Sequence, residues 1–202
     1  MSTESSAPDP IAIFEKAAVA VHEIMACIRQ DQSDAATPCA EWNVRDVMNH
    51  VIGGAEVLAG SLEGNMPEGV GGVSPVSSYS GEMDVARLAQ AYADETARSL
   101  AGARQPGAMS ATTPGGMMTV PQFLIAMAAD HIVHGWDLAR ATGQDEALDA
   151  EVVEAAYAMM TSAEGSMFVD MGRQMGFVGP AIAVPDGANV QDKLVAHMGR
   201  QP

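Results

Sequence analysis

The sequence predicts an all-α fold, and three observations support that prediction. Hydrophobic residues make up 48% of the 202 residues, whereas aromatic residues make up only 4% and methionine occurs 15 times. Small and flexible side chains of this kind favour close helix packing over a β-sandwich, whose strands prefer β-branched and aromatic residues. Apolar residues also recur at helical spacing behind good capping residues. We expect a single domain over residues 1–202, with residues 1–9 as a disordered tail.

The first two expected helices each begin at a capping residue. Asp9 can cap the first helix, with Pro10 in its first turn, and the apolar pattern continues to about residue 30. Asn43 can cap the second helix, with Asp46 three residues later as its capping-box partner. The residues between the two helices are rich in turn formers and are expected to form a connection.

Two irregular stretches flank the third expected helix, which covers about residues 84–101. The stretch 64–81 is rich in Gly, Ser and Pro, and it could be a binding loop or a simple crossover between helix ends. The stretch 101–118 could hold a short hairpin around residues 114–116.

The remaining chain is expected to form two more helices and a tail. Thr119 can cap the fourth helix, and Gly143 can end it. A fifth helix is expected over about 150–162. From residue 176 onward we expect an extended tail along the surface, with a last short helix over 190–198.

Charge and cysteine content narrow the function classes. The formal net charge of −16 comes from 26 acidic and 10 basic residues, and it disfavours nucleic acid and anionic membrane surfaces as partners. No apolar run approaches the ~20 residues of a membrane span, and the polar N-terminus does not read as a secretory signal. Cys27 and Cys39 form no disulfide framework, so reduced thiols in a cytoplasmic protein are expected. A catalytic Cys39 is a minor alternative.

Asp130 and His134 are the most informative pair in the sequence. They lie four residues apart on the fourth expected helix, and so about 40° apart on one face. A carboxylate and an imidazole placed in this way can hold two adjacent coordination positions of one metal ion. His50, on the second expected helix, could supply a third ligand. Three nitrogen and oxygen ligands leave coordination positions open, as metal catalysis requires.

Other assignments of these side chains stay open at the level of sequence. A structural network in which a carboxylate fixes a buried imidazole explains the pattern as well as a metal does. His131 and His134, three residues apart, could also bind metal together. Asp137 could orient an imidazole as a hydrogen-bond acceptor, or it could pair with Arg45 or Arg140.

Three parts of the chain resemble the DinB-like superfamily. They are TPCAEWNVRDVMNH (37–50), DHIVHGWDLARATG (130–143), and GFVGP (176–180) leading to DKLVAHMGR (192–200). The resemblance is strongest to actinobacterial members related to the metal-binding domain of mycothiol-dependent maleylpyruvate isomerase. It implies a four-helix bundle with an additional helix and an extended C-terminal tail.

The resemblance also implies a divalent metal held by His50, Asp130 and His134. Asp130 stands where related proteins carry Glu or His. Zinc is the default metal for two histidines and one carboxylate, although nickel, iron and manganese fit the same donors.

A metal- and thiol-dependent transferase or isomerase is the activity that the resemblance implies. Mycothiol or another low-molecular-weight thiol would be the cofactor, and His131 would be a general base if it faces the cavity. The partners would be a small-molecule substrate or thiol and, in a homodimer, a second copy of the chain. The reaction of the isomerase itself is not expected here, because that enzyme uses a further C-terminal domain. The alternative is a non-catalytic protein whose metal is structural or sensory.

Overall fold

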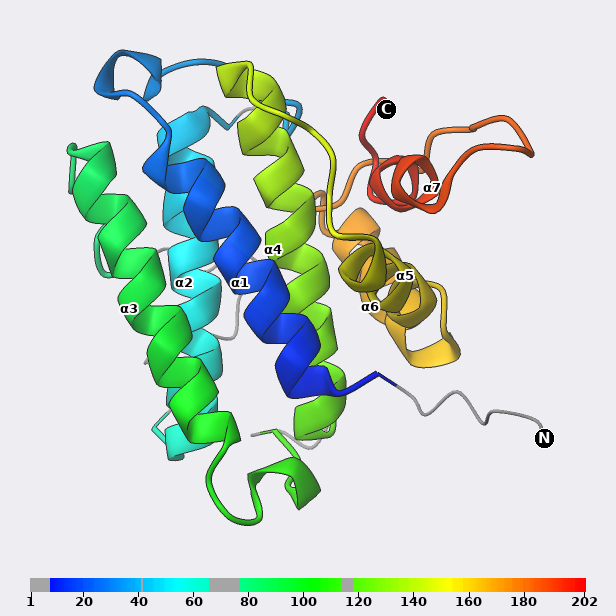
Figure 1. Ribbon diagram of the computed structural model, residues 1–202. Coiled ribbons are helices and arrows are strands. Elements are labelled where there is room, and N and C mark those ends of the chain that lie inside the picture. Colours follow the sequence, from blue (N-terminus) through cyan, green and yellow to red (C-terminus); the bar gives the residue numbers. More distant parts are fainter. Residues whose placement is uncertain (1–7, 41, 66–76, 114–117) are drawn as a thin grey trace.

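The computed structural model describes residues 8–40, 42–65, 77–113 and 118–202. Every regular element within them is a helix, which confirms the predicted all-α fold (Figure 1). The four long helices are α1 (Pro10–Ala26), α2 (Val44–Glu63), α3 (Val85–Ala103) and α4 (Val120–Thr142). The shorter helices are α5 (Ala150–Met160), α6 (Ala163–Gln174), α7 (Val190–His197) and the 3-10 turns η1 (Gln30–Gln32) and η2 (Ala108–Ser110).

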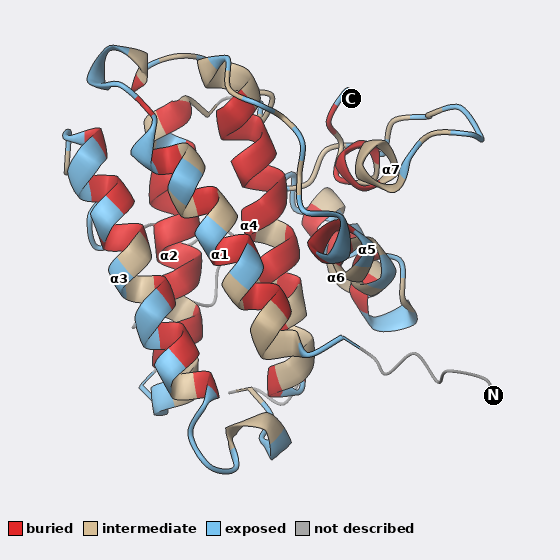
Figure 2. Cartoon of the chain, in the orientation of Figure 1, coloured by how far each residue is buried: buried red, intermediate tan, exposed pale blue. Residues whose placement is uncertain are grey.

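The four long helices form the expected bundle. Helices α1 and α2 each pack against both α3 and α4, and α5 packs on α4 and α1 from the outside. Helices α6 and α7 pack on α5. Helix α4 therefore lies between its partners in the bundle and the C-terminal helices, and it is buried around most of its circumference (Figure 2).

Apolar burial along α4 holds this arrangement together. Leu124, Ile132 and Leu138 are completely buried, and only 1% of the surface of Trp136 is exposed. Each such side chain stabilises the fold by about 1.5–3 kcal/mol relative to an exposed one. The helices are therefore held together by their apolar faces, independently of any polar group between them.

The predicted helix caps are present. The side chain of Asp9 accepts from the backbone N–H of Ile11 at the start of α1. Asn43 forms a reciprocal capping box with Asp46 on α2, and Thr119 does the same with Gln122 on α4. Gly143 ends α4 in the left-handed conformation, with φ of 71°. These local signals explain why the starts of these helices were predictable.

Two helix predictions need correction. Helix α1 ends at Ala26, four residues early, because the backbone there tightens into an i to i+3 hydrogen bond from Cys27 to Ile24. Helix α6 was not predicted at all. Gly165 and Gly172 weaken its helical signal, yet the packing requires Gly165, because a Cβ there would lie 1.9 Å from the carbonyl oxygen of Met159.

Three sequence predictions fall partly or wholly outside the described residues. Residues 1–7 of the predicted tail and residues 66–76 of the predicted 64–81 loop are among them. So are residues 114–117, where the hairpin turn was expected. The chain on either side of that turn does pair, because the N–H of Thr113 donates to the carbonyl of Met118 at 2.9 Å.

Candidate metal centre

The structure brings together the three residues predicted to hold a metal. His50 comes from α2, and Asp130 and His134 come from adjacent turns of α4. The Nε2 atom of His50 lies 3.3 Å from Asp130 Oδ2, and the Nε2 atom of His134 lies 3.7 Å from Asp130 Oδ1. One potential ligand atom from each residue lies within 4.8 Å of the other two. This arrangement fits the donors of one ion.

The three side chains differ in exposure. His50 and His134 are buried, whereas the Asp130 side chain retains 28% of its accessible surface. Burial acts to raise the pKa of Asp130, but the neighbouring charges of His50 and His134 outweigh it and hold the pKa below its ordinary value. Burial lowers the pKa of His134, which favours the neutral imidazole that a metal needs.

A second layer of side chains fixes the orientation of His134. The Nδ1 atom of His134 lies 3.0 Å from Asp137 Oδ2, on the side of the ring away from Asp130. Arg200 binds the same carboxylate through two contacts, Nη2 to Oδ2 at 2.8 Å and Nε to Oδ1 at 3.3 Å. Arg200 also donates to the carbonyl of Met198 at 2.7 Å. A carboxylate that accepts from Nδ1 leaves Nε2 as the lone-pair nitrogen, directed toward Asp130.

Asp137 therefore acts as the predicted acceptor for an imidazole, and its arginine partner is Arg200. The two alternative partners are engaged elsewhere: Arg45 pairs with Asp34 at 2.8 Å, and Arg140 pairs with Glu146 at 2.6 Å. Burial opposes the charge on Asp137, yet the hydrogen bond from His134 and the charge of Arg200 keep the pKa of this carboxyl below its ordinary value.

Trp42 packs over the two histidines from the chain that precedes α2. Its ring centroid lies 4.7 Å from that of His50 and 5.8 Å from that of His134. The indole therefore packs against both imidazoles on one side of the site.

A cavity of about 360 Å³ opens over the candidate ligands. Its lining residues come from the chain before α2, from α2 and α4, and from α6 and the C-terminal segment. Its lining residues are Cys39, Ala40, Trp42, His50, Asp130, His134, Phe168, Gly172, Gly176, Phe177, Val178, Met198 and Arg200. A space of this size accommodates a small organic ligand.

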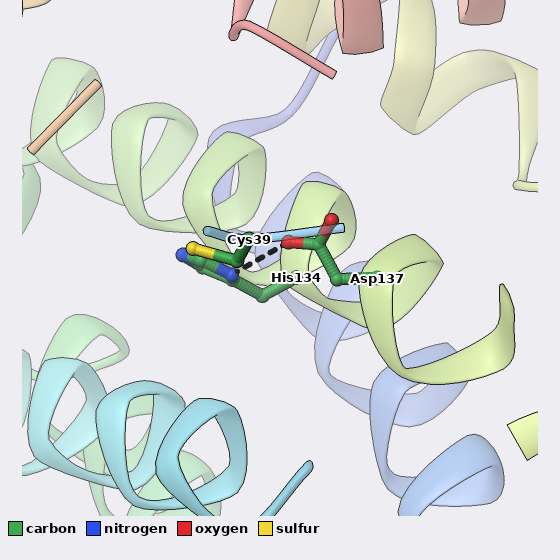
Figure 3. Close-up of side chains that lie close together, drawn as sticks. All are labelled: Cys39, His134 and Asp137. Atoms are coloured by element: carbon green, nitrogen blue, oxygen red, sulfur yellow. Dashed lines mark hydrogen bonds and ion pairs between the residues drawn. The ribbon is translucent and has the colours of Figure 1, made fainter. Parts of the chain in front are cut away.

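Cys39 lies beside the candidate centre. Figure 3 shows its thiol next to the imidazole of His134, with the Asp137 carboxylate on the hydrogen-bonded side of the ring. The ligand atoms of Cys39, His134 and Asp137 lie within 4.8 Å of one another, which makes a second group that shares His134 with the first. Burial raises the pKa of the Cys39 thiol to about 11, so without a metal the thiol stays protonated near neutral pH.

His131 does not line the cavity. It is completely buried, and its Nδ1 atom lies 2.9 Å from the hydroxyl oxygen of Tyr92 on α3. The general-base role required His131 to face the cavity, so this position does not support it. Gly54 also packs against His131: a Cβ at Gly54 would lie 3.0 Å from its Nε2.

Arg200 and Trp42 were missed as site residues by reasoning from the sequence. Arg200 lies 63 residues from Asp137, and no spacing rule connects them. Its one sequence signal is its position at the end of the third segment that carries the family resemblance. Trp42 lies in the first such segment, directly before the cap of α2.

The donor set fits a divalent transition metal. Two imidazoles and a carboxylate are typical ligands of zinc and its neighbours, and they leave coordination positions open. His134 has the hydrogen-bonded second nitrogen that metal-binding histidines usually show. The described residues provide no such partner for His50 Nδ1.

Comparison with known proteins identifies the class of this chain. The family described as mycothiol maleylpyruvate isomerase N-terminal domain matches residues 14–139, more than half of the 202 residues. The chain belongs to this family, which confirms the resemblance seen in the sequence. The match ends at residue 139, so the cavity wall between Phe168 and Arg200 lies outside it.

Two relatives cover nearly the whole chain. Each is 31% identical over 194 residues, which is 95% of this chain and 98% of the relative. Both are described as uncharacterized proteins of Mycobacterium tuberculosis, one from strain CDC 1551 / Oshkosh and one from strain ATCC 25618 / H37Rv. No solved structure matches the chain. None of the helices in the described ranges has both the length and the apolar character needed to cross a membrane.

Proposed function

We propose that this protein binds one divalent metal through His50, Asp130 and His134 and acts as a metal-dependent transferase or isomerase that uses a low-molecular-weight thiol of the mycothiol type. One observation carries the proposal: the three donors converge at a cavity of about 360 Å³ instead of being closed into the core. Zinc is the first choice of metal, and nickel, iron and manganese suit the same donors.

The residues around the donors would have separate roles in such a site. Asp137 and Arg200 hold His134 with Nε2 toward Asp130. Trp42 shields the imidazoles from one side. A metal bound here would lower the pKa of a thiol ligand and so supply thiolate near neutral pH.

The cavity walls favour a ligand of mixed character. Phe168, Phe177 and Val178 offer apolar contacts, and Asp130 and Arg200 offer charged groups. An organic thiol with a polar body matches these walls better than a purely apolar substrate does. The proposed partners are accordingly small molecules in the cytoplasm, and the net charge of −16 supports neither nucleic acid nor an anionic membrane as a partner.

The alternative class is a non-catalytic protein in which the metal ties α2 to α4 or serves as a sensor. The same ligand positions allow it, because His50 lies on α2 and the other two donors lie on α4. Against it, α2 and α4 already pack directly on each other within the apolar core. A structural site also normally has four permanent protein ligands, whereas three of the described residues converge in this group.

Thermal unfolding with and without chelator, beside a thiol titration, separates the two classes. For an enzyme we expect a small decrease in melting temperature on chelation and metal-dependent binding of mycothiol or 2-mercaptoethanol. For a structural ion, chelation should lower the free energy of unfolding by several kcal/mol, because the free energy of metal binding then contributes directly to folding. A large drop in melting temperature with no thiol binding to the metal-loaded protein would contradict the proposed function.

A further inference from the structure

Cys39 lines the same cavity as the candidate metal ligands, but the metal site formed by His50, Asp130 and His134 gives it no role. It lies between η1 and α2, in irregular chain that is tied locally by hydrogen bonds with Thr37. Its sulfur approaches His134 and Asp137, with ligand atoms within 4.8 Å of one another. Figure 3 shows that the thiol and the imidazole lie side by side.

The group formed by Cys39, His134 and Asp137 is a poor independent cation site. Both oxygens of Asp137 already accept from Arg200, and one of them also contacts His134 Nδ1. A second cation there would lie against the guanidinium of Arg200. Cys39 is therefore better considered with the first donor set, His50, Asp130 and His134, because His134 belongs to both groups.

The first donor set has room for a sulfur ligand. Its residues are two histidines and one carboxylate, and four ligands complete a tetrahedral site. In the structure the sulfur of Cys39 lies one layer outside this set, beside His134. Among the lining residues it is the thiol that a metal bound there would meet, since Cys27 is exposed and does not line the cavity. Met198 also lines the cavity, but its thioether has no S–H proton to lose.

We infer that Cys39 is an exchangeable fourth ligand of the metal, which its thiolate occupies until a low-molecular-weight thiol displaces it. This inference rests on the proposed function, because it presumes the metal held by His50, Asp130 and His134. In the exchange, the incoming thiol gives up its S–H proton and binds through sulfur. Cys39 leaves as the protonated thiol, so the proton lost by one sulfur is gained by the other. Cys39 thereby keeps the site closed in the absence of thiol and accepts a proton when the thiol enters.

Cobalt substitution of the full-length protein tests the inference directly. A cobalt–thiolate bond gives a charge-transfer band in the near ultraviolet, whereas the visible bands of cobalt report binding by any ligand set. We expect the ultraviolet band in the wild type and in Cys27→Ser, and its loss in Cys39→Ser. Adding 2-mercaptoethanol to cobalt-loaded Cys39→Ser should restore the band, because an external thiol then takes the empty position. Thermal unfolding of each variant verifies that the fold is kept.

The possible outcomes separate this inference from the proposed function. If cobalt binds but the wild type lacks the ultraviolet band, or Cys39→Ser keeps it, Cys39 is not a ligand and the inference is overturned, while the metal site stands. If the wild type binds no cobalt, both fail.

Discussion

His131 and His134 lie three residues apart on the same helix and are both buried, yet they have different surroundings. His131 faces α3, where its Nδ1 meets the hydroxyl of Tyr92 at 2.9 Å. His134 faces the cavity, with Asp137 at 3.0 Å from Nδ1 and Asp130 at 3.7 Å from Nε2. One imidazole therefore has a neutral partner within the bundle, and the other has two carboxylates at its edge.

This difference shows that the chemical surroundings of each histidine depend on the face of α4 from which it projects. A separation of three residues turns a side chain about 60° around a helix, which is enough to move it from the core to the cavity. Burial lowers the pKa of His131 to about 4, despite the opposing charge of Asp130, so this ring stays neutral as part of the packing. The predictions below test whether the two histidines are as separate in function as they are in space.

The largest expected effect is loss of the metal in His134→Ala. Elemental analysis of protein purified without a histidine tag should find close to one equivalent in the wild type. The variant should hold less than about a tenth of an equivalent, because the site then lacks the imidazole that Asp137 and Arg200 hold in place. His131→Phe is the matched control and should keep its metal. Equal metal contents in the two variants would contradict the assignment of His134.

The next effect concerns the residues behind His134. Asp137→Asn and Arg200→Met should each weaken metal binding roughly 10–100-fold, because residues that orient a ligand usually contribute that much. Competition with a chromophoric chelator measures the affinity. Asp170→Asn is a suitable control, since Asp170 pairs with Arg173 with 63% of its side-chain surface exposed. Unchanged affinity in both test variants would show that His134 does not need this support.

A smaller effect, on stability alone, is expected where His131 on α4 contacts Tyr92 on α3. Tyr92→Phe removes the hydroxyl that contacts His131 and leaves a buried nitrogen without its partner. The free energy of unfolding should fall by about 1–3 kcal/mol, measured by urea denaturation, with no change in metal content. The exposed Tyr79 provides the control Tyr79→Phe, for which we expect little change. Loss of metal in Tyr92→Phe would show that the two histidine environments are coupled.

The smallest effect is expected for Gly54→Ala. The new methyl would lie 3.0 Å from His131 Nε2, so the ring has to shift slightly. Alanine gains about 1 kcal/mol of helix propensity over glycine, which offsets this crowding. Urea denaturation should therefore find stability within about 1 kcal/mol of the wild type, with metal affinity unchanged. A drop in metal affinity would mean that His131 transmits strain to Asp130 beside it.

Much of the fold could be predicted from the sequence because its signals are local. The capping boxes of Asn43 with Asp46 and of Thr119 with Gln122 join residues three positions apart, and they mark the starts of α2 and α4. The spacing of Asp130 and His134 placed both donors on one helix face in the same way. Helix α6 was missed because glycine lowers helix propensity, and the close approach of Gly165 to the carbonyl of Met159 at the end of α5 becomes visible only in the folded chain.

The sequence by itself determined the helical class, the helix starts and one pair of candidate ligands, since all of these depend on residues within a turn or two of each other. The sequence also offered His50 as a third ligand from its place on the second expected helix, and the family resemblance implied the same three residues. Only the tertiary structure decided that His131 turns to Tyr92, that Arg200 binds Asp137, and that Cys39 lies beside His134. These contacts join residues between 39 and 95 positions apart along the chain. They arise from how the helices pack, and packing depends on the whole set of buried surfaces rather than on any local pattern.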